Sequence, residues 1–357
     1  MEIKFLVSGA AWKPLGGLRM IYEYANRLAA DGHKVSIYYS ANSDIGLYGL
    51  PQKAKAVVKY LYLKYIKSYK CSSWFKLSPQ ISEIWLWKFD EAGVGYADRY
   101  IATTIESAYN LKNFNAPLEK KFYFIQGFEN WGFRITDDHV IGSYKFGFRN
   151  IVISDWLKRI IDGQGVSCVK VQNGFDFNQF FVGTPVKDRC RYEIAMMYNS
   201  SPYKGCADCF SALEIVHKKY PELHVSVFGI PERPESLPEW YSYYKQPSRD
   251  KLRELYNSAA IFIGASYHEG WGLTIGEAML CGCAVACTDN PGYCEMAKSG
   301  KTALVSPVKS PSALAENIIA LIEDEELRYR IADASVKYMA SFDLEYTYNL
   351  FRQAIGC

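Results

Sequence analysis

The sequence predicts an α/β protein built from two doubly wound domains. Short apolar runs of the kind that form buried parallel strands alternate with longer helical patterns along the chain. The alternation occurs in two series, one that starts at residue 3 and one that starts near Tyr192. The length of 357 residues also exceeds the roughly 250–300 residues at which a single core stops growing. We therefore expect two domains with parallel sheets.

The first series opens with a strand, a glycine loop, a helix and a second strand. The first strand is expected over residues 3–7, the loop at Gly16 and Gly17, the helix over 18–30 and the second strand over 35–39. Such a βαβ unit directs its loop toward whatever lies above the sheet. Further strands of this series are expected at 99–102, 122–125 and 150–153.

The second series repeats the alternation and ends in a separate helix. The domain join is expected near residues 180–187, where Gly183 and Pro185 interrupt the pattern. The predicted domains are thus 1–182 and 183–340, and a helix in 341–357 would cross back to the first domain. The expected elements are strands at 193–198, 224–228, 261–265 and 284–286, and helices at 207–219, at 249–258 and from 274 onward.

Composition excludes several classes of protein. The net charge of +3 is too small for a protein whose main partner is nucleic acid. The ten cysteines are scattered and far too few for a disulfide scaffold, which favours free thiols in a reducing compartment. The opening apolar stretch is short and reaches Gly9 at once, as a first strand would, and no apolar run approaches the roughly 20 residues that span a bilayer. A cytoplasmic protein is expected.

Two glutamates, with seven residues between them, frame the loop that follows the predicted strand at 261–265. Glu269 would lie in the loop and Glu277 in the first two turns of the next helix. In an open α/β sheet, ligands bind at the carboxyl ends of the strands. Taken alone, Glu277 would equally suit an acid that complements the helix dipole. Loop glycines and amide groups at a helix start favour a diphosphate site, here at Gly270, Trp271, Gly272, Leu273, Thr274 and Ile275.

Several motifs occur in an order that resembles one enzyme family. The chain resembles the family 4 retaining glycosyltransferases, whose GT-B fold has two doubly wound, Rossmann-like domains that face each other across a cleft. Each motif alone is weak, whereas the ordered series is specific and extends over most of the chain. The matching positions are 16–17, 32–35, 153–154, 172–176, 204–205, 269–277, 282–286 and 300–305.

The resemblance assigns roles to three charged residues. It implies that Glu269 contacts hydroxyl groups of the donor sugar and that Glu277 holds the ribose of the nucleotide. Carboxylates suit both roles, because charge-assisted hydrogen bonds are roughly twice as strong as neutral ones. Lys204 would neutralise the charge that develops on the leaving diphosphate. The alternative for Lys204 is an ordinary surface lysine.

The glycine loop and one nearby polar position complete the implied donor site. Gly16 and Gly17 match a loop whose amide groups approach the diphosphate from the N-terminal domain, unless they form a plain tight turn. Asn199 stands where the family usually has an arginine, five residues before the lysine. A second cation for the leaving group would then have to come from Arg19 or Arg249.

A second departure from the family follows the predicted strand at 122–125. Gln126 occupies the place of a histidine found in many relatives. Glutamine can orient a sugar hydroxyl but cannot relay a proton, which fits a front-face mechanism in which the leaving phosphate takes the acceptor's proton. The stretch 125–129 resembles a subset that includes rhamnosyltransferases of surface polysaccharides. Glu129 is either an acceptor contact or a simple loop acid.

Residues 53–70 contain six lysines and no acid. At 100° per residue, an apolar face separates from the lysines, as in helices that bind a membrane interface. Lys59 and Lys64 are candidate contacts to an anionic acceptor or membrane. The alternative is a helix packed on the core with a solvated lysine face. The apolar positions are Ala54, Val57, Val58, Leu61, Tyr65 and Tyr69, and the lysines are Lys53, Lys55, Lys59, Lys64, Lys67 and Lys70.

These implications predict a retaining hexosyl- or deoxyhexosyltransferase of surface polysaccharide or glycoconjugate synthesis. The donor would be a UDP-, GDP- or dTDP-linked sugar bound by the C-terminal domain, and the acceptor a glycan or lipid-linked sugar bound by the N-terminal domain. No metal or other cofactor is expected, since no Asp-x-Asp motif follows a strand. The rivals are an epimerase or phosphorylase of the same fold, and a non-catalytic sugar-nucleotide binder. A dehydrogenase is disfavoured because its glycine fingerprint is missing.

Overall fold

The computed structural model describes residues 1–357 except 10–13, 43–44, 48, 67–71, 131–133 and 236, and it omits the side chains of residues 63 and 66. Two compact units are present: unit 1 comprises Met1–Asn173 and Thr347–Cys357, and unit 2 comprises Gly174–Tyr346. Unit 1 thus ends before the boundary expected at residue 182. The reason is that Phe175 already packs in unit 2, where its N–H donates to the carbonyl of Phe342 at 2.8 Å.

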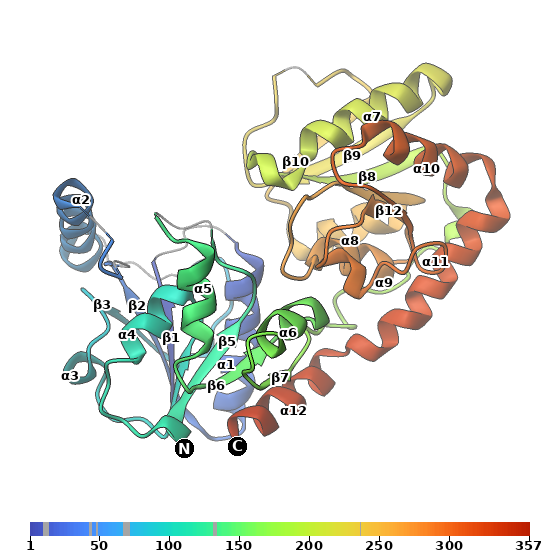
Figure 1. Cartoon of the computed structure of the whole chain (residues 1–357). Helices are drawn as coiled ribbons and strands as arrows, with labels where there is room; N and C mark the ends of the chain where they lie inside the picture. The colour runs from blue at the N-terminus through green and yellow to red at the C-terminus, as the bar shows by residue number, and fades with distance from the viewer. Residues whose placement is uncertain (10–13, 43–44, 48, 67–71, 131–133, 236) are drawn as a thin grey trace. The chain divides into compact units, whose positions relative to one another are not determined.

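Unit 1 is a parallel α/β sandwich. Among the described residues its sheet has seven strands in the order β3-β2-β1-β4-β5-β6-β7 (Figure 1). The strands are β1 (Glu2–Ser8), β2 (Lys34–Ser40), β3 (Ser82–Leu86), β4 (Arg99–Ala102), β5 (Lys121–Ile125), β6 (Arg149–Val152) and β7 (Cys168–Lys170), and the helices are α1 (Gly16–Ala30), α2 (Leu50–Leu61), α3 (Glu91–Val94), α4 (Ile105–Leu111), α5 (Asp137–Tyr144), α6 (Asp155–Asp162) and α12 (Leu344–Ile355).

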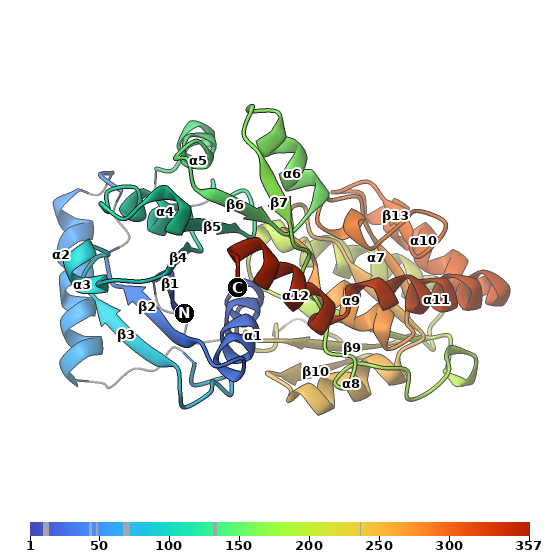
Figure 2. The same ribbon diagram turned by 90° about the horizontal axis from the view of Figure 1, so that it is seen from below.

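Helices cover both faces of the unit 1 sheet. On one face, α1 and α12 lie side by side in Figures 1 and 2. The ring of Phe351 stacks on Tyr24 with centroids 4.5 Å apart and meets the edge of Phe124 of β5 at 5.3 Å. On the other face, the neighbouring β5 residue Tyr123 contacts Tyr144 of α5 at 6.2 Å. Adjacent residues of one strand therefore pack into two separate cores, one on each face, as expected for a doubly wound sheet.

Unit 2 repeats this plan with a smaller sheet. Among the described residues it has six parallel strands in the order β10-β9-β8-β11-β12-β13. The prediction of two doubly wound α/β domains is confirmed. The strands are β8 (Glu193–Tyr198), β9 (His224–Gly229), β10 (Tyr241–Lys245), β11 (Ile261–Gly264), β12 (Ala284–Thr288) and β13 (Leu304–Ser306), and the helices are α7 (Cys206–Lys219), α8 (Arg249–Ser258), α9 (Leu273–Leu280), α10 (Pro311–Glu323) and α11 (Glu325–Met339).

Two helices of unit 2 begin in an unusual way. Ser248 caps α8 by accepting a hydrogen bond from the Lys251 N–H, as polar residues commonly do at helix starts. In contrast, α7 and α9 follow Gly205 and Gly272, which have φ values of 61° and 101° and provide no side-chain cap. Left-handed backbone of this kind strongly favours glycine. Both helices begin at the carboxyl ends of strands, where the predicted site residues lie.

Candidate functional site

An ion pair between Lys204 and Glu269 lies at the centre of the candidate site in unit 2. The Lys204 ammonium donates to Glu269 Oε1 at 2.6 Å, and the two side chains are only 17% and 15% exposed. Lys204 ends the turn that follows β8, and Glu269 lies in the loop that follows β11. Because β8 and β11 are neighbours in the parallel sheet, the loops after them meet at one edge. The structure thus brings together two residues that are 65 positions apart in sequence.

A buried hydrogen-bond chain orients the Glu269 carboxylate. The Tyr293 hydroxyl donates to Ser266 Oγ at 2.9 Å, and Ser266 Oγ donates to Glu269 Oε1 at 2.9 Å. Burial raises the pKa of Tyr293 well above its usual value, and the nearby Glu269 carboxylate adds to the effect. The phenol therefore remains a hydrogen-bond donor. Ser266 Oγ and the Lys204 ammonium both donate to Oε1, so one carboxylate oxygen is fixed directly by two residues and indirectly by Tyr293.

Two further polar residues hold this loop in place. Thr288 Oγ1 and Asn290 Nδ2 donate to the carbonyl of Ser266 at 2.7 and 3.0 Å. Asn290 Oδ1 also accepts from the Tyr293 N–H at 3.1 Å. The sequence analysis gave Ser266 no separate role and did not select Thr288, Asn290 or Tyr293. The available signal was that polar residues lie at or just after the ends of β11 and β12, whose carboxyl ends are adjacent.

Glu277 lies in the second turn of α9 and is only 4% exposed. The Tyr256 hydroxyl donates to its Oε2 at 3.2 Å. Burial, followed by the proximity of Glu277, raises the pKa of Tyr256 well above its usual value. A buried carboxylate needs polar partners to offset its desolvation. The Tyr256 bond therefore explains how unit 2 accommodates this acid beneath the loop.

The rest of the predicted diphosphate loop differs in part from the expectation. Gly270, Gly272, Leu273 and Thr274 belong to the turn into α9 and to its first residues. The expectation that the Ile275 N–H is free is wrong, because this group donates to the Gly272 carbonyl at 3.1 Å.

The ring of Trp271 is 3% exposed and packs on Phe342 with centroids 5.6 Å apart. The indole therefore contributes to the core of unit 2, and its Nε1 is buried without a hydrogen-bond partner among the described residues. Donor contact by Trp271 stays a prediction.

Asn199 shapes the turn that leads to Lys204. Its Oδ1 accepts from the Ser201 N–H at 2.8 Å, and its own N–H donates to Cys206 Sγ at 3.3 Å. Of the two arginines considered as substitutes for the family's cation, Arg249 lies in unit 2, where its guanidinium stacks over Phe180 at 5.6 Å. Arg19 lies in unit 1 beside Glu23.

In unit 1, the structure brings the glycine loop and Gln126 together. Gly16 is the first residue of α1, and a Cβ placed on Gly17 would lie 3.2 Å from Gln126 Oε1. That oxygen is buried and has no hydrogen-bond partner among the described residues. A buried amide oxygen without a partner is costly, so a ligand hydroxyl at this position would be stabilising.

Glu129 lies close to Gln126 in sequence and contacts the start of α4. Its Oε2 accepts from the Ile105 N–H at 2.5 Å. Burial and the neighbouring Glu106 raise the pKa of Glu129 to about 8. The shift favours the neutral carboxylic acid form of Glu129. As one alternative predicted, Glu129 lies in a loop, and its bond to the first N–H of α4 gives it a structural role there.

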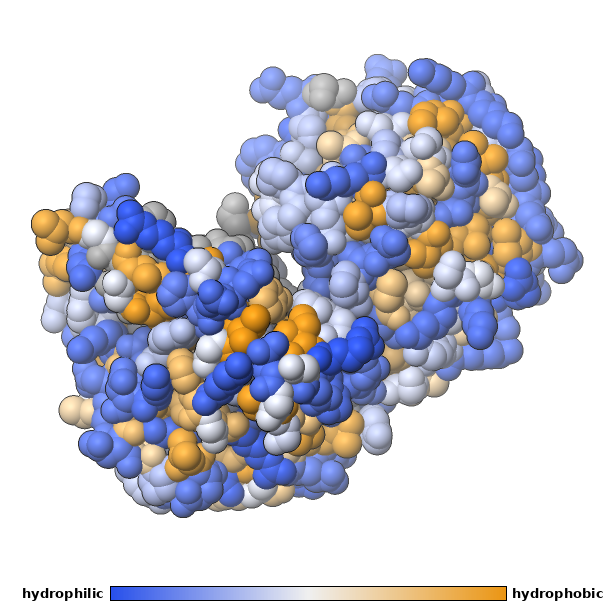
Figure 3. Space-filling view, in the orientation of Figure 1, coloured by the Kyte–Doolittle hydropathy of each residue, from blue (hydrophilic) through white to orange (hydrophobic). Residues whose placement is uncertain are grey.

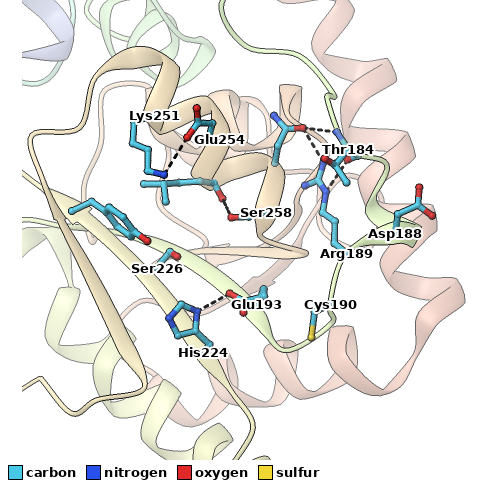
Figure 4. A pocket seen from close by; sticks show the side chains of 13 residues that line it. Thr184, Asp188, Arg189, Cys190, Glu193, His224, Ser226, Lys251, Glu254 and Ser258 are labelled. Atoms are coloured by element: carbon cyan, nitrogen blue, oxygen red, sulfur yellow. Dashed lines mark hydrogen bonds and ion pairs between the residues drawn. The ribbon is translucent and has the colours of Figure 1, made fainter.

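A separate pocket of about 650 Å³ lies at the opposite ends of the unit 2 strands (Figure 4). Glu193 and His224, which begin β8 and β9, are hydrogen bonded at 2.7 Å, and Lys251 pairs with Glu254 at 3.1 Å. The Arg189 guanidinium donates to backbone carbonyls. Two charged pairs thus satisfy one another and Arg189 is bound by backbone, and the pocket contains none of the predicted site residues.

The fold defines a class of protein. Two parallel-sheet α/β units are the architecture of GT-B glycosyltransferases, and solved structures of this class align with nearly the whole chain. Sucrose-phosphate synthase from Thermosynechococcus elongatus aligns with a TM-score of 0.73 at 15% identity, over 99% of each chain. HepE from Anabaena, solved with UDP and glucose, aligns with a TM-score of 0.71 at 16% identity, also over 99% of each chain. Identities this low establish the fold alone.

Sequence comparison places a family domain within unit 2. Residues 185–338 match the family described as "Glycosyl transferases group 1". The matched stretch, which is less than half of the chain, contains Lys204, Glu269 and Glu277. It also contains the Ser266 to Tyr293 network.

Curated relatives match over shorter stretches. The N,N'-diacetylbacillosaminyl-diphospho-undecaprenol alpha-1,3-N-acetylgalactosaminyltransferase of Campylobacter jejuni is 33% identical over 106 residues, which is 30% of this chain and 27% of the relative. The phosphatidyl-myo-inositol mannosyltransferase of Mycobacterium tuberculosis is 23% identical over 208 residues, 54% of this chain and 55% of the relative. The chain therefore spans between about a quarter and about half of the length of these relatives.

Proposed function

We propose that the protein is a retaining glycosyltransferase that moves a sugar from a nucleoside diphosphate to a glycan or lipid-linked acceptor. The observation that carries the proposal is the contact between Lys204 and Glu269 at the carboxyl ends of β8 and β11. This pair offers a cation for a diphosphate next to a carboxylate for sugar hydroxyls. Its place within a glycosyltransferase group 1 domain supports the same activity.

The proposed chemistry uses the charges of unit 2 and needs no protein base. Lys204 neutralises the leaving diphosphate while the free oxygen of Glu269 accepts a hydrogen bond from a sugar hydroxyl. Glu277 takes the ribose hydroxyls of the donor. The bond between the anomeric carbon and the phosphate oxygen breaks, and the acceptor oxygen bonds to the same face of that carbon. The acceptor's proton passes to the departing phosphate oxygen, and Gln126 orients a sugar hydroxyl through its amide.

The names of the relatives guide the choice of substrates. Solved HepE structures contain UDP or UDP-glucose, so UDP-sugars are the first donors to test, ahead of GDP- and dTDP-sugars. The names of the Campylobacter and Mycobacterium relatives refer to lipid-borne molecules, a diphospho-undecaprenol and a phosphatidyl-myo-inositol. We therefore propose a lipid-linked glycan acceptor of a surface polysaccharide. A rhamnosyl or hexosyl donor and action in the cytoplasm at the inner face of a membrane are part of this proposal.

The stereochemistry of the product tests the proposed mechanism. The glycosidic linkage is expected to keep the anomeric configuration of the donor, because attack occurs on the face that the phosphate leaves. Activity should also survive EDTA, since Lys204 replaces a metal at the diphosphate. NMR of the product reads the linkage directly. An inverted product would exclude the front-face mechanism, and sugar release without an acceptor would favour an epimerase or hydrolytic role.

The two glutamate variants are expected to lose activity to a similar extent but to differ in how tightly they bind the nucleotide. Glu269→Gln and Glu277→Gln should each lower kcat/KM by about 10- to 150-fold, since each loses a charge-assisted bond worth roughly 1.5–3 kcal/mol. Glu269→Gln should bind the free nucleoside diphosphate at least as tightly as the parent, because Lys204 is released from its ion pair. Glu277→Gln should bind it more weakly. Calorimetry and initial rates measure both effects, and wild-type kcat/KM in both variants would contradict the assigned site.

A further inference from the structure

Helix α2 and the π-helical turn η1 (Tyr62–Ile66) form an exposed apolar surface on unit 1. In the described part of α2 only Ala56 is buried, and Tyr60 contacts Trp87 with ring centroids 5.8 Å apart. The core-packed alternative for this helix is therefore wrong. The exposed large apolar side chains are Leu50 at 84%, Val57 at 42%, Val58 at 69%, Leu61 at 47%, Tyr62 at 44% and Tyr65 at 70%.

These side chains form a stripe and not a random scatter. At about 100° per residue, the apolar positions of α2 from Leu50 to Leu61 lie within roughly 100° of the helix surface, on the side away from Ala56. We name this set, with Tyr65, the α2 stripe. Soluble proteins seldom leave a contiguous apolar patch uncovered unless it binds something. Figure 3 shows hydrophobic and hydrophilic side chains next to each other at the position that α2 occupies in Figure 1.

The charge beside the stripe has a single sign. Residues 50–66 contain Lys53, Lys55, Lys59 and Lys64 and no acid. Lys64 Nζ donates to the Tyr60 hydroxyl at 2.8 Å and lies over the Tyr65 ring at 5.4 Å, so this lysine stays beside the apolar side chains. Lys67 and Lys70 of the predicted lysine helix lie outside the described residues.

An apolar stripe bordered by cations matches an anionic lipid surface. Apolar side chains of an interfacial helix enter the boundary between headgroups and acyl chains, while lysine stems extend to the phosphates. A second copy of this chain is a poor partner, because two such helices would place lysines against lysines. No helix in the described part of the chain is long and apolar enough to cross a bilayer.

We propose that α2 and η1 dock unit 1 on an anionic membrane surface, with the α2 stripe in the interface and the lysines on lipid phosphates. The proposal does not depend on the transfer reaction. A lipid-linked acceptor would, however, reach the protein at such a surface.

Vesicle sedimentation with the full chain tests the docking. The parent protein should sediment with phosphatidylcholine vesicles that contain phosphatidylglycerol, and less with phosphatidylcholine alone. Binding should weaken with added salt, which screens exposed charges. Each lysine near an anionic surface strengthens binding about fivefold, so combined Lys55→Gln, Lys59→Gln and Lys64→Gln should weaken it about 100-fold. Val58→Ser with Leu61→Ser should also weaken binding, with little change in its salt dependence.

A matched variant separates docking from net charge. Lys187, Lys218 and Lys337 are exposed lysines of unit 2, and changing all three to Gln removes the same charge. This control should bind vesicles like the parent. Equal losses in both triple variants would reduce the effect to net charge and overturn the proposal, as would a parent that fails to bind at low salt. Concentration-dependent self-association that Val58→Ser with Leu61→Ser abolishes would assign the stripe to a second copy instead.

Discussion

Replacing Lys204 with alanine is expected to lower kcat/KM by about 100- to 1,000-fold, the usual effect of removing one group that stabilises developing charge in a transition state. The Lys204 ammonium is only partly exposed and has one carboxylate at 2.6 Å. When a diphosphate leaves the anomeric carbon, this ammonium is the proposed partner for the new negative charge. Asn199 stands where the family that the chain resembles usually has an arginine, so Lys204 is the cation next to Glu269 on which the proposal depends. The loss in the Lys204 variant should therefore be large.

Binding measurements separate this role from a structural one. Lys204→Ala should weaken binding of the nucleoside diphosphate far more than binding of the nucleoside, because only the diphosphate carries the charge. Lys219→Ala provides a matched control, since it removes another lysine of unit 2 that pairs with a glutamate, Glu323, at 2.5 Å. That pair is half exposed, and such surface pairs contribute only about 0–1 kcal/mol. Equal effects of Lys204→Ala on both ligands would make the residue structural.

The contact between Lys204 and Glu269 illustrates what the sequence could predict. Both residues follow apolar runs that read as parallel strands, and a doubly wound sheet places the loops after neighbouring strands at one edge. The fold class and the approximate position of the proposed donor site follow from that pattern. The pattern does not give strand order, however, so the pairing of β8 with β11 could not be derived from periodicity alone.

The burial and the long-range contacts of each side chain could not be predicted from the periodicity of the sequence. Trp271 lies inside the predicted loop, yet its ring packs on Phe342, a residue 71 positions later that no local pattern connects to it. The α2 stripe is the reverse case, in which apolar side chains are exposed rather than buried. An amphipathic pattern shows that apolar residues share one face, but only the structure shows that this face is exposed. Likewise, Tyr293 and Ser266 meet only because β12 returns beside β11.

Replacing Gly205 with alanine is expected to lower the free energy of unfolding of unit 2 by about 2–5 kcal/mol. Left-handed backbone costs a residue with a Cβ about 1–2 kcal/mol, and overpacking adds about 1–3 kcal/mol. Gly205 has a φ of 61°, and an added Cβ would lie 1.9 Å from the Ala265 carbonyl oxygen. That carbonyl belongs to the backbone residue directly after β11, so it cannot move aside as a flexible side chain would.

Gly300→Ala is the matched control for backbone strain. Gly300 has a φ of 69°, but a Cβ there would meet nothing within 4 Å. The free energy of unfolding of this variant should fall by only about 1–2 kcal/mol, which is the cost of the left-handed conformation. Native-state hydrogen exchange of the core amides of β8 and β11 measures both changes within unit 2. Equal losses in the two variants would show that the approach of Gly205 to Ala265 is not tight.

The same contact connects stability to the site. Gly205 directly follows Lys204, and Ala265 lies four residues before Glu269, so the close approach of these two backbones sets the distance between the loops that carry the ion pair. A Gly205→Ala protein that remains folded should therefore bind a nucleoside diphosphate more weakly, although no charged group has been removed. Gly300→Ala should bind it like the parent. Undiminished binding by folded Gly205→Ala would mean that Lys204 reaches the diphosphate independently of this contact.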